Sequence, residues 1–276
     1  MKPIFILLLI FTLCGCADDQ YQIEKKYWQA QRQADKVFNN PKATPPKQLE
    51  RVVGILESFA KKYPKINLAL DARFNIARLY MAKEQYPQAR QELNNIITDY
   101  KKFNEVVSET IFMLGNSYEL EGKWGQAQEQ YQKIMQDYAA TLRGMNTPLY
   151  IAEHYRIKYQ PDKMVEAFRS AIAHYRTLAG MHQDTPMAYA AYQLSAQCYV
   201  ALKEWQGALN AYADILEKFK GKTDLSGVLM NMAFIYDNEL KDKIKAKEML
   251  ERLCSEYPSS RLTKSAQALL DKINKK

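Results

Sequence analysis

A short pattern that recurs along this chain constrains its fold more than any other feature of the sequence. In residues 86–89, 124–127 and 205–208 an aromatic side chain stands three positions before an alanine. A tyrosine lies nine residues before each alanine, an alanine or glycine lies three residues before that tyrosine, and a tyrosine or phenylalanine lies eleven residues after the alanine. The same spacing fits two further segments, one around Tyr155 with Met164 in place of the alanine, and one around Tyr236 with one extra residue in the turn. Five copies of one template therefore follow one another.

Each copy has the pattern of two helices joined by a turn. Glycine and proline number only ten each, and no stretch alternates apolar and polar residues over the length of a strand. Small residues one turn from a tyrosine allow two helices to approach closely. The ladder of Ala127, Tyr131, Ile134 and Tyr138 keeps one face of the second helix apolar. The template predicts a series of helical hairpins.

These hairpins resemble the tetratricopeptide repeat, although the period here is 37, 38 or 44 residues instead of 34. The resemblance implies an all-α fold, an α-solenoid of about six tetratricopeptide-like helical hairpins over residues 21–276. The first hairpin is predicted from a helix over residues 21–38 and a second over 52–63, separated by a proline-containing turn. Residues 177–186 are predicted to form a long loop, and residues 262–273 a capping helix that covers the end of the array.

The first residues of the chain have the pattern of an export signal. Lys2 precedes an apolar run of eight residues, 4–11, which is too short to span a bilayer. The run is followed by Leu13-Cys14-Gly15-Cys16, which resembles the lipobox of bacterial lipoproteins. The resemblance implies a signal peptide over 1–15, lipidation of Cys16 and a tether over 16–20. The alternative is an ordinary signal peptide cut after Gly15 or Ala17.

The same resemblance suggests a location. Asp directly after the lipidated cysteine favours retention at the inner membrane, whereas this chain has Ala17 there. We therefore expect a protein anchored by lipid to the outer membrane and facing the periplasm, with the membrane contacted through the anchor only. Two or three acyl chains hold a protein stably, whereas one does so only marginally.

Charge and cysteine usage limit the partners. Removal of the signal peptide leaves 38 basic and 31 acidic side chains with no run of five like charges, so we expect no nucleic-acid partner. Anionic headgroups, cell-wall polymer and acidic protein surfaces stay open. Cys198 and Cys254 are expected to be small buried thiols, a disulfide between them being the alternative.

The sequence contains no recognisable catalytic constellation. The mature chain has no nucleophile elbow, phosphate loop, HExxH or CxxC motif. His154, His174 and His182 are the metal candidates, and an exposed or structural role is the alternative that we favour. We expect no catalytic residues, no cofactor, no metal and no small-molecule substrate.

The surface expected to bind a partner is the outer face of the first helix of each hairpin. Two phenylalanines with amides and an arginine there suit an extended peptide or a partner helix. The alternative is that both phenylalanines pack against a neighbouring helix. The predicted row is Phe74, Arg78, Met81, Phe112, Asn116, Glu119, Glu153, Arg156, Gln193, Gln197 and Asn231.

These features together predict a non-enzymatic scaffold that holds other envelope proteins. The long period and the Tyr-Pro link at residues 63–64 and 257–260 are similar to the lipoproteins BamD and CpoB (YbgF). The likeness to BamD implies a role in assembling outer-membrane barrels. Coordination of cell-wall enzymes, as with CpoB or an adaptor for a peptidoglycan hydrolase, is the alternative, and a pilotin-like role in pilus or secretin assembly is a third.

Overall fold

The protein is all-α, as the sequence predicts. The structure is a computed structural model that describes residues 19–274, and these residues divide into two compact units, 19–99 and 100–274. The first unit contains α1 (Gln20–Asn39), α2 (Pro46–Lys62), α3 (Asn67–Ala82) and α4 (Tyr86–Asp99). The second contains α5 (Asn104–Leu120), α6 (Trp124–Asp137), α7 (Leu142–Ile157), α8 (Pro161–Met181), α9 (Pro186–Ala201), α10 (Trp205–Lys218), α11 (Ser226–Phe234), the π-helix η1 (Ile235–Glu239), α12 (Lys243–Glu256) and α13 (Thr263–Asn274). The predicted signal segment 1–15 and Cys16 lie outside the described residues.

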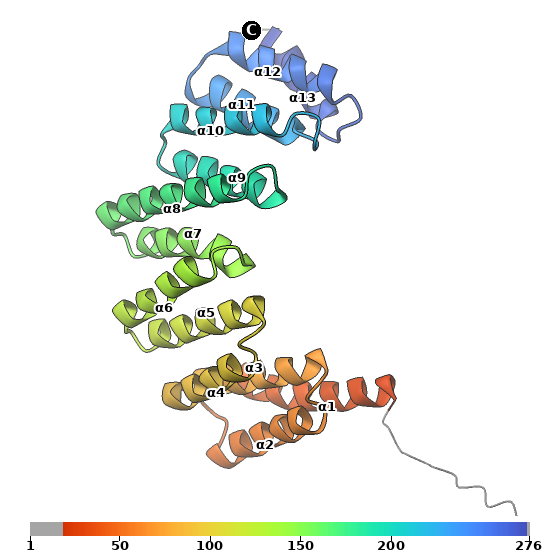
Figure 1. The fold of residues 1–276 in the computed structure, drawn as a ribbon, viewed down its shortest axis with the longest axis vertical. Coiled ribbons are helices and arrows are strands. Elements are labelled where there is room, and N and C mark those ends of the chain that lie inside the picture. Colours follow the sequence, from red (N-terminus) through yellow and green to blue (C-terminus); the bar gives the residue numbers. More distant parts are fainter. Residues whose placement is uncertain (1–18, 275–276) are drawn as a thin grey trace, which may run out of the picture. The chain divides into compact units, whose positions relative to one another are not determined.

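Successive helices pack in antiparallel pairs (Figure 1). The first unit contains the hairpins α1/α2 and α3/α4. The second contains α5/α6, α7/α8, α9/α10 and α11-η1/α12, with α13 packed on α12 at the end. The prediction of six helical hairpins and a terminal helix is therefore confirmed.

The turn inside five of the hairpins has one repeated geometry. The residue four or five positions after the template tyrosine has a positive φ, and the next residue donates its backbone N–H to the tyrosine carbonyl at 2.8–3.0 Å. This is the Schellman arrangement, which satisfies carbonyls left free at a helix end. The positive-φ residues are Glu84, Gly122, Tyr159, Lys203 and Lys241. Because this hydrogen-bonded turn recurs, the tyrosine and the alanine-position residue stay nine residues apart in four of these hairpins, and ten apart in the last.

Small residues bring the two helices of a hairpin together. A Cβ atom added at Gly115 of α5 would collide with the ring of Tyr131 on α6, whereas one added at Gly125 would meet nothing within 4 Å. Ala127, Tyr131 and Ile134 of α6 are fully buried. The register inferred from the tyrosine and small-residue positions is therefore correct in this hairpin.

The predicted long loop at residues 177–186 is wrong. Helix α8 has 21 residues and continues to Met181, whereas α4, α6, α10 and α12 have 14 each. The extra seven residues equal the difference between the 44- and 37-residue periods, and they make almost two complete helical turns. Leu178 and Ala179 consequently continue the buried stripe of Tyr175.

The extra residue of the last hairpin is also placed differently from the prediction. It lies within the first helix of the hairpin, where Ile235–Glu239 forms one π-helical turn, and not in the connecting turn. A π-turn accommodates one additional residue without breaking the helix. Tyr236 still accepts the turn hydrogen bond, from the N–H of Asp242 at 2.8 Å.

The second helix of the first hairpin begins earlier than predicted. Helix α2 starts at Pro46 instead of Val52, because a proline at the first helical position lacks only an N–H that would have no helical partner there. The turn before it is fastened to α3 by Lys83, whose Nζ donates to the carbonyls of Pro41 at 2.6 Å and Thr44 at 2.9 Å.

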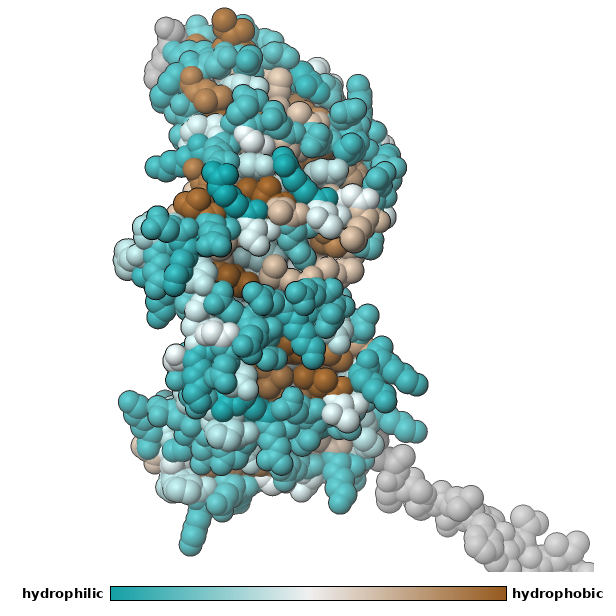
Figure 2. Space-filling model, turned by 60° about the vertical axis from the view of Figure 1, so that its left-hand side comes forward, coloured by the Kyte–Doolittle hydropathy of each residue, from teal (hydrophilic) through white to brown (hydrophobic). Residues whose placement is uncertain are grey.

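The face of the molecule that Figure 2 draws is mostly hydrophilic. Hydrophobic side chains gather on it in separate areas. Among the helices between residues 20 and 274, none is both long enough and apolar enough to cross a membrane.

Candidate functional site

In the first unit, the predicted row is only partly exposed. Arg78 is exposed and Met81 is half-buried, but Phe74 is buried, with only 7% of its surface exposed. The expectation that Phe74 is an exposed groove residue is therefore wrong, because α3 is packed against α1 as well as α2 and α4. The Arg78 guanidinium lies 6.0 Å from the Phe74 ring centroid and donates to Asn75 Oδ1 at 3.3 Å.

In the second unit, the row on α5 meets α6 and α7. Phe112 is buried at 7% exposure, so its predicted exposure is also wrong, and the alternative that it packs against a neighbouring helix is correct. Its ring lies 5.3 Å from that of Tyr131 and 5.0 Å from that of Tyr150, and the Arg143 guanidinium covers it at 4.1 Å. Phe112 is an anchor for the contact between two successive hairpins.

Glu119 is the centre of a hydrogen-bond network at this contact. Its carboxylate accepts from the hydroxyl of Tyr150 at 2.7 Å and that of Tyr131 at 3.0 Å, and it contacts His154 Nδ1 at 2.7 Å. The Tyr131 hydroxyl also lies 2.9 Å from Asn116 Oδ1, so the two acceptors share its single proton. We call Asn116, Glu119, Tyr131, Tyr150 and His154 the Glu119 network.

Burial and the carboxylate keep both tyrosines of the network protonated. Burial is the main cause, and the hydrogen bond to Glu119 the second, of a rise in the pKa of Tyr150 to about 12. Burial raises the pKa of Tyr131 still further, and the charges of its neighbours act in the same direction. Both hydroxyls therefore remain donors to Glu119 at neutral pH, which fixes the orientation of the carboxylate.

An aromatic stack supports the network from the start of α6. The indole of Trp124 lies parallel to the His154 ring, with centroids 3.4 Å apart and planes at 5°. The indole Nε1 donates to the Tyr155 hydroxyl at 3.0 Å. Trp124 is the aromatic residue of the repeat pattern at residues 124–127, and in the structure it also stacks on His154 and positions it.

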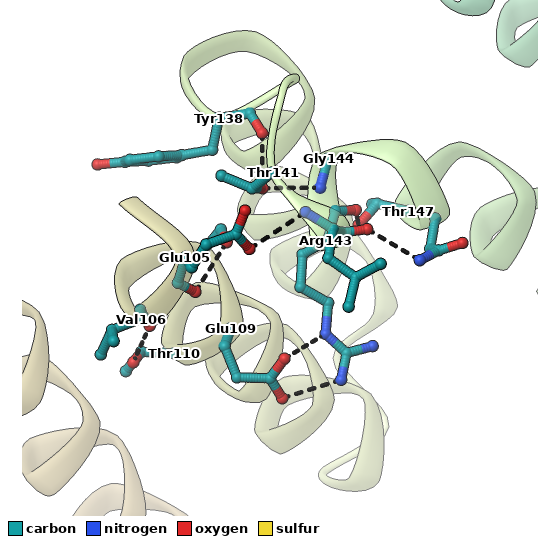
Figure 3. A network of polar contacts seen from close by, with 12 residues as sticks. Glu105, Val106, Glu109, Thr110, Tyr138, Thr141, Arg143, Gly144 and Thr147 are labelled. Carbon is teal, nitrogen blue, oxygen red and sulfur yellow. Dashed lines mark hydrogen bonds and ion pairs between the residues drawn. The ribbon is translucent and has the colours of Figure 1, made fainter. Parts of the chain in front are cut away.

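The beginning of α7 is bound to α5 by polar contacts (Figure 3). Arg143 forms a two-point ion pair with Glu109, at 2.5 and 2.9 Å. The Leu142 N–H donates to Glu105 at 3.2 Å, and Thr141 caps α7 by accepting from the Gly144 N–H at 3.0 Å. These contacts hold the two first helices of neighbouring hairpins side by side, and so fix the geometry of the surface between them.

The remaining row residues lie further along the second unit. Glu153 and Arg156 pair with each other at 2.6 Å, and Gln193 donates to the Tyr189 hydroxyl at 3.0 Å. Gln197 and Asn231 are exposed. The structure thus brings Asn116 and Glu119 into one network and leaves the other row positions as separate polar groups on successive first helices.

The sequence pattern does not predict Tyr150 and His154 as partners of Glu119. The two are four residues apart on one face of α7, and Arg143 lies seven residues before Tyr150 on the same face. The predicted row on α7 was displaced by one position, to Glu153. The i, i+4 spacing of Tyr150 and His154 was the available signal.

A hollow of about 430 Å³ lies next to the network, between α6, α7 and α8. Its lining includes Met135, Pro148, Tyr155 and Lys163. Tyr155 joins the hollow to the Trp124 stack through its hydroxyl. The mixture of apolar and charged lining suits a side chain of a bound protein.

The three histidines do not share a site. His154 belongs to the Glu119 network, His174 lies on α8, and His182 follows it. In the part of the chain that the structure describes, no three His, Cys, Asp or Glu side chains are grouped so that they could hold a metal ion. Cys198 and Cys254 are free thiols, the first buried and the second half-buried, and burial raises the pKa of Cys198 to about 12.

Comparison with known families agrees with the architecture. The family model of the tetratricopeptide repeat matches residues 71–102, 109–141, 190–221 and 228–260. These segments coincide with the hairpins α3/α4, α5/α6, α9/α10 and α11-η1/α12. These four segments are tetratricopeptide repeats, a class of repeat that forms protein-binding scaffolds.

Two solved structures can be aligned with most of the chain. One is BtubC (BKLC) from P. vanneervenii, with 13% identity, a TM-score of 0.41, and coverage of 90% of this chain and 92% of that one. The other is the TPR2AB domain of yeast Sti1 in a complex with pHSP90, with 15% identity, a TM-score of 0.33, and coverage of 91% and 99%. No curated protein matches the sequence.

Proposed function

We propose that this protein is a non-enzymatic, lipid-anchored scaffold of the bacterial envelope that binds other proteins along the first helices of its hairpins. The observation that carries the proposal is the Glu119 network and the exposed polar positions that follow it in the second unit. Repeated hairpins present one such face after another, and an extended peptide or a partner helix has the length to contact several of them.

The network supports binding because its acceptor is already oriented. Tyr131, Tyr150 and His154 hold the Glu119 carboxylate, whose side chain keeps 24% of its surface exposed. A partner donor, such as an arginine or a backbone N–H, then meets a fixed acceptor and does not have to order it. The exposed ion pair of Glu153 and Arg156 on the next part of the face offers charges of both signs.

The proposed cellular location rests on the sequence of residues 1–17. The apolar run and Leu13-Cys14-Gly15-Cys16 support lipidation at Cys16, and Ala17 supports the outer membrane, with the repeats in the periplasm. Within this class, assembly of outer-membrane barrels, as with BamD, is the first proposal. Coordination of cell-wall enzymes, as with CpoB, is the second, supported by the same long period and Tyr-Pro link; a pilotin-like role is the third.

Site-specific crosslinking tests the binding face. A photoreactive residue placed at Arg78, Arg156, Gln197 or Asn231 is expected to capture a protein in the native envelope. The same residue at Lys133 of α6 or Glu217 of α10, which are exposed on second helices, is the control. Capture at the controls alone would contradict the face that we assign. Mass spectrometry of the captured protein distinguishes a barrel-assembly partner from a cell-wall enzyme or a secretin.

The anchor has a separate test. Mass spectrometry of the mature protein is expected to show an acylated Cys16 as its first residue. Cys16→Ser should block cleavage and release or mislocalise the protein. An unmodified amino terminus after Gly15 or Ala17 would instead support the ordinary signal peptide, while leaving the crosslinking result valid.

A further inference from the structure

The outer side of α1 carries an exposed stripe of aromatic and basic residues. Tyr21, Lys25, Trp28 and Arg32 are spaced by four, three and four positions, which places them on one face of the helix. Tyr21 is 66% exposed and Trp28 is 56% exposed. We call these four residues the α1 ridge.

The ridge is not a part of the core that has failed to pack. The opposite face of α1 is fully used, since Tyr27, Ala30, Ala34 and Val37 are buried against α2 and α3. Asp19 caps the helix by accepting from the Gln22 N–H at 2.7 Å. The helix is thus held in place with the ridge directed away from its own hairpin, and aromatic side chains grouped on one exposed face mark an interaction surface.

The first unit as a whole is basic, while Glu24 and Asp35 lie on the same side of α1 as the ridge. Residues 19–99 contain fourteen Lys and Arg against nine Asp and Glu, a formal charge of +5 out of +8 for the whole chain. Beside the ridge, between α1 and α2, a hollow of about 530 Å³ is lined by Lys26, Arg51 and Lys62 together with Phe59 and Tyr63. Lys26 donates to the Tyr63 hydroxyl at 3.2 Å, so basic and aromatic groups are interleaved here too.

This combination fits the polar surface of a membrane. Tyr and Trp are enriched where apolar and aqueous phases meet, and Lys and Arg extend to anionic headgroups. An interfacial helix has this pairing of aromatic residues with a basic polar face. A purely apolar partner would leave Lys25 and Arg32 unpaired, and a purely acidic one would leave the two rings uncovered.

The position of the ridge in the chain agrees with this partner. Asp19 follows Cys16 by three residues, which span at most roughly 11 Å when extended. If Cys16 carries the proposed acyl chains, the start of α1 cannot be further than this from the headgroups. This part of the argument rests on the proposed function.

We propose that the α1 ridge lies on an anionic lipid surface, with the rings of Tyr21 and Trp28 among the headgroups and with Lys25 and Arg32 on their phosphates. The lipid anchor then limits the distance of the first unit from the membrane, and the ridge determines which side of the unit faces it. The ridge would thus be a second attachment to the membrane. The sequence alone predicts only one, the lipid anchor at Cys16.

Tryptophan quenching on vesicles tests the contact without depending on lipidation in the cell. The chain from Cys16 onward, with Cys254→Ser because Cys254 is half-buried, is coupled through the Cys16 thiol to a maleimide lipid. The vesicles contain phosphatidylglycerol and phosphatidylethanolamine, with or without brominated acyl chains. Brominated lipid is expected to quench the emission of the wild-type chain more than that of Trp28→Phe, because Trp28 is the tryptophan of the ridge.

Charge variants sharpen the test. Lys25→Glu with Arg32→Glu is expected to reduce the Trp28 quenching at least about twofold, as is salt well above 0.1 M, where the Debye length falls below about 10 Å. Lys133→Glu with Lys158→Glu makes the same change of net charge at exposed positions of the second unit and should leave quenching unchanged. Circular dichroism verifies that each variant is folded.

Three results would overturn the proposal. These are equal Trp28 emission with brominated and ordinary lipid, equal loss in the two charge variants, and a concentration-dependent dimer in which Trp28 is protected without lipid. The last would assign the ridge to a second copy of this chain. Because coupling is chemical, failure here leaves acylation of Cys16 to be decided by mass spectrometry, and an unmodified Cys16 leaves the quenching result valid.

Discussion

Two helix contacts of the second unit follow the same repeat template but differ in the side chains that form them. We call the contact between α5, α6 and α7 the polar seam and the contact between α8, α9 and α10 the apolar seam. Between α5, α6 and α7 the contact is polar and aromatic, with Glu119 accepting from two tyrosines and Arg143 paired with Glu109. Between α8, α9 and α10 it is apolar, with small residues such as Ala191 and Ala208 fully buried and Phe168 at 1% exposure. The difference teaches that the template specifies how closely helices approach, and the residues between template positions decide whether a seam stabilises the fold or also presents polar groups to a partner.

The apolar seam should be the more sensitive to loss of volume. Phe168→Ala is expected to lower the free energy of unfolding by about 3–5 kcal/mol, because it removes a fully buried ring and leaves a cavity. Denaturant unfolding measures the change. Phe234→Ala is the control, since Phe234 is 60% exposed, and equal losses at the two sites would contradict the packing described for α8.

The close approach inside the polar seam has its own test. Gly115→Leu is expected to cost on the order of 1–3 kcal/mol, because any side chain there meets the buried ring of Tyr131. Gly125→Leu introduces the same side chain where the space is open and should cost much less. A similar loss of unfolding free energy in both variants would mean that the hairpin register is wrong.

Removing the acceptor of the network should have a smaller effect. Glu119→Ala leaves the hydroxyls of Tyr131 and Tyr150 without their carboxylate and is expected to cost about 1 kcal/mol, the low end of the range for a lost acceptor. The low end applies because the Glu119 side chain is 24% exposed, so water reaches part of the site. Glu119→Gln keeps one acceptor oxygen and should cost less still. If Glu119→Ala were as costly as Phe168→Ala, the polar seam would be the main source of stability and the contrast drawn here would fail.

The smallest expected effect is a dependence on pH that arises from His174 of α8. Burial lowers the pKa of His174 below its ordinary value of 6.5, and its Nε2 has no hydrogen-bond partner among the described residues. The folded state therefore favours the neutral ring, so this contribution to stability is present above about pH 6.5 and is lost as the pH falls through the folded-state pKa. Melting temperatures of the wild type and His174→Gln are expected to differ in their change between about pH 7.5 and pH 5. Identical pH profiles for the two proteins would show that His174 is not the titrating group.

Much of the fold could be predicted from the sequence because it repeats. The tyrosine spacing reflects a turn of fixed hydrogen bonding, so residues as different as Gly122 and Tyr159 stand at the same positive-φ position. The insertion before Pro186 misled the prediction because its composition resembles a loop. Its length of seven residues is compatible with continuing the helix, and the buried Leu178 and Ala179 provide the apolar contacts that stabilise it there.

The site was less predictable because it depends on how one hairpin packs on the next. A template of one hairpin gives the face of α5 that carries Phe112, Asn116 and Glu119, but not the angle at which α7 crosses it. That angle buries Phe112 and brings Tyr150 and His154 to Glu119. The partner role of the predicted row and the lipidation of Cys16 stay predictions.

The extended helix α8 has a consequence for how such chains can change in length. Seven residues advance an α-helix by almost two whole turns, so the insertion leaves every later side chain pointing in nearly the same direction as before. An insertion or deletion of seven in the second helix of a repeat is therefore nearly in phase, whereas a change of one residue needs a local adjustment such as the π-turn at Ile235–Glu239. Length variation among proteins of this kind should accordingly favour heptad steps within second helices, and single-residue steps should coincide with π-turns.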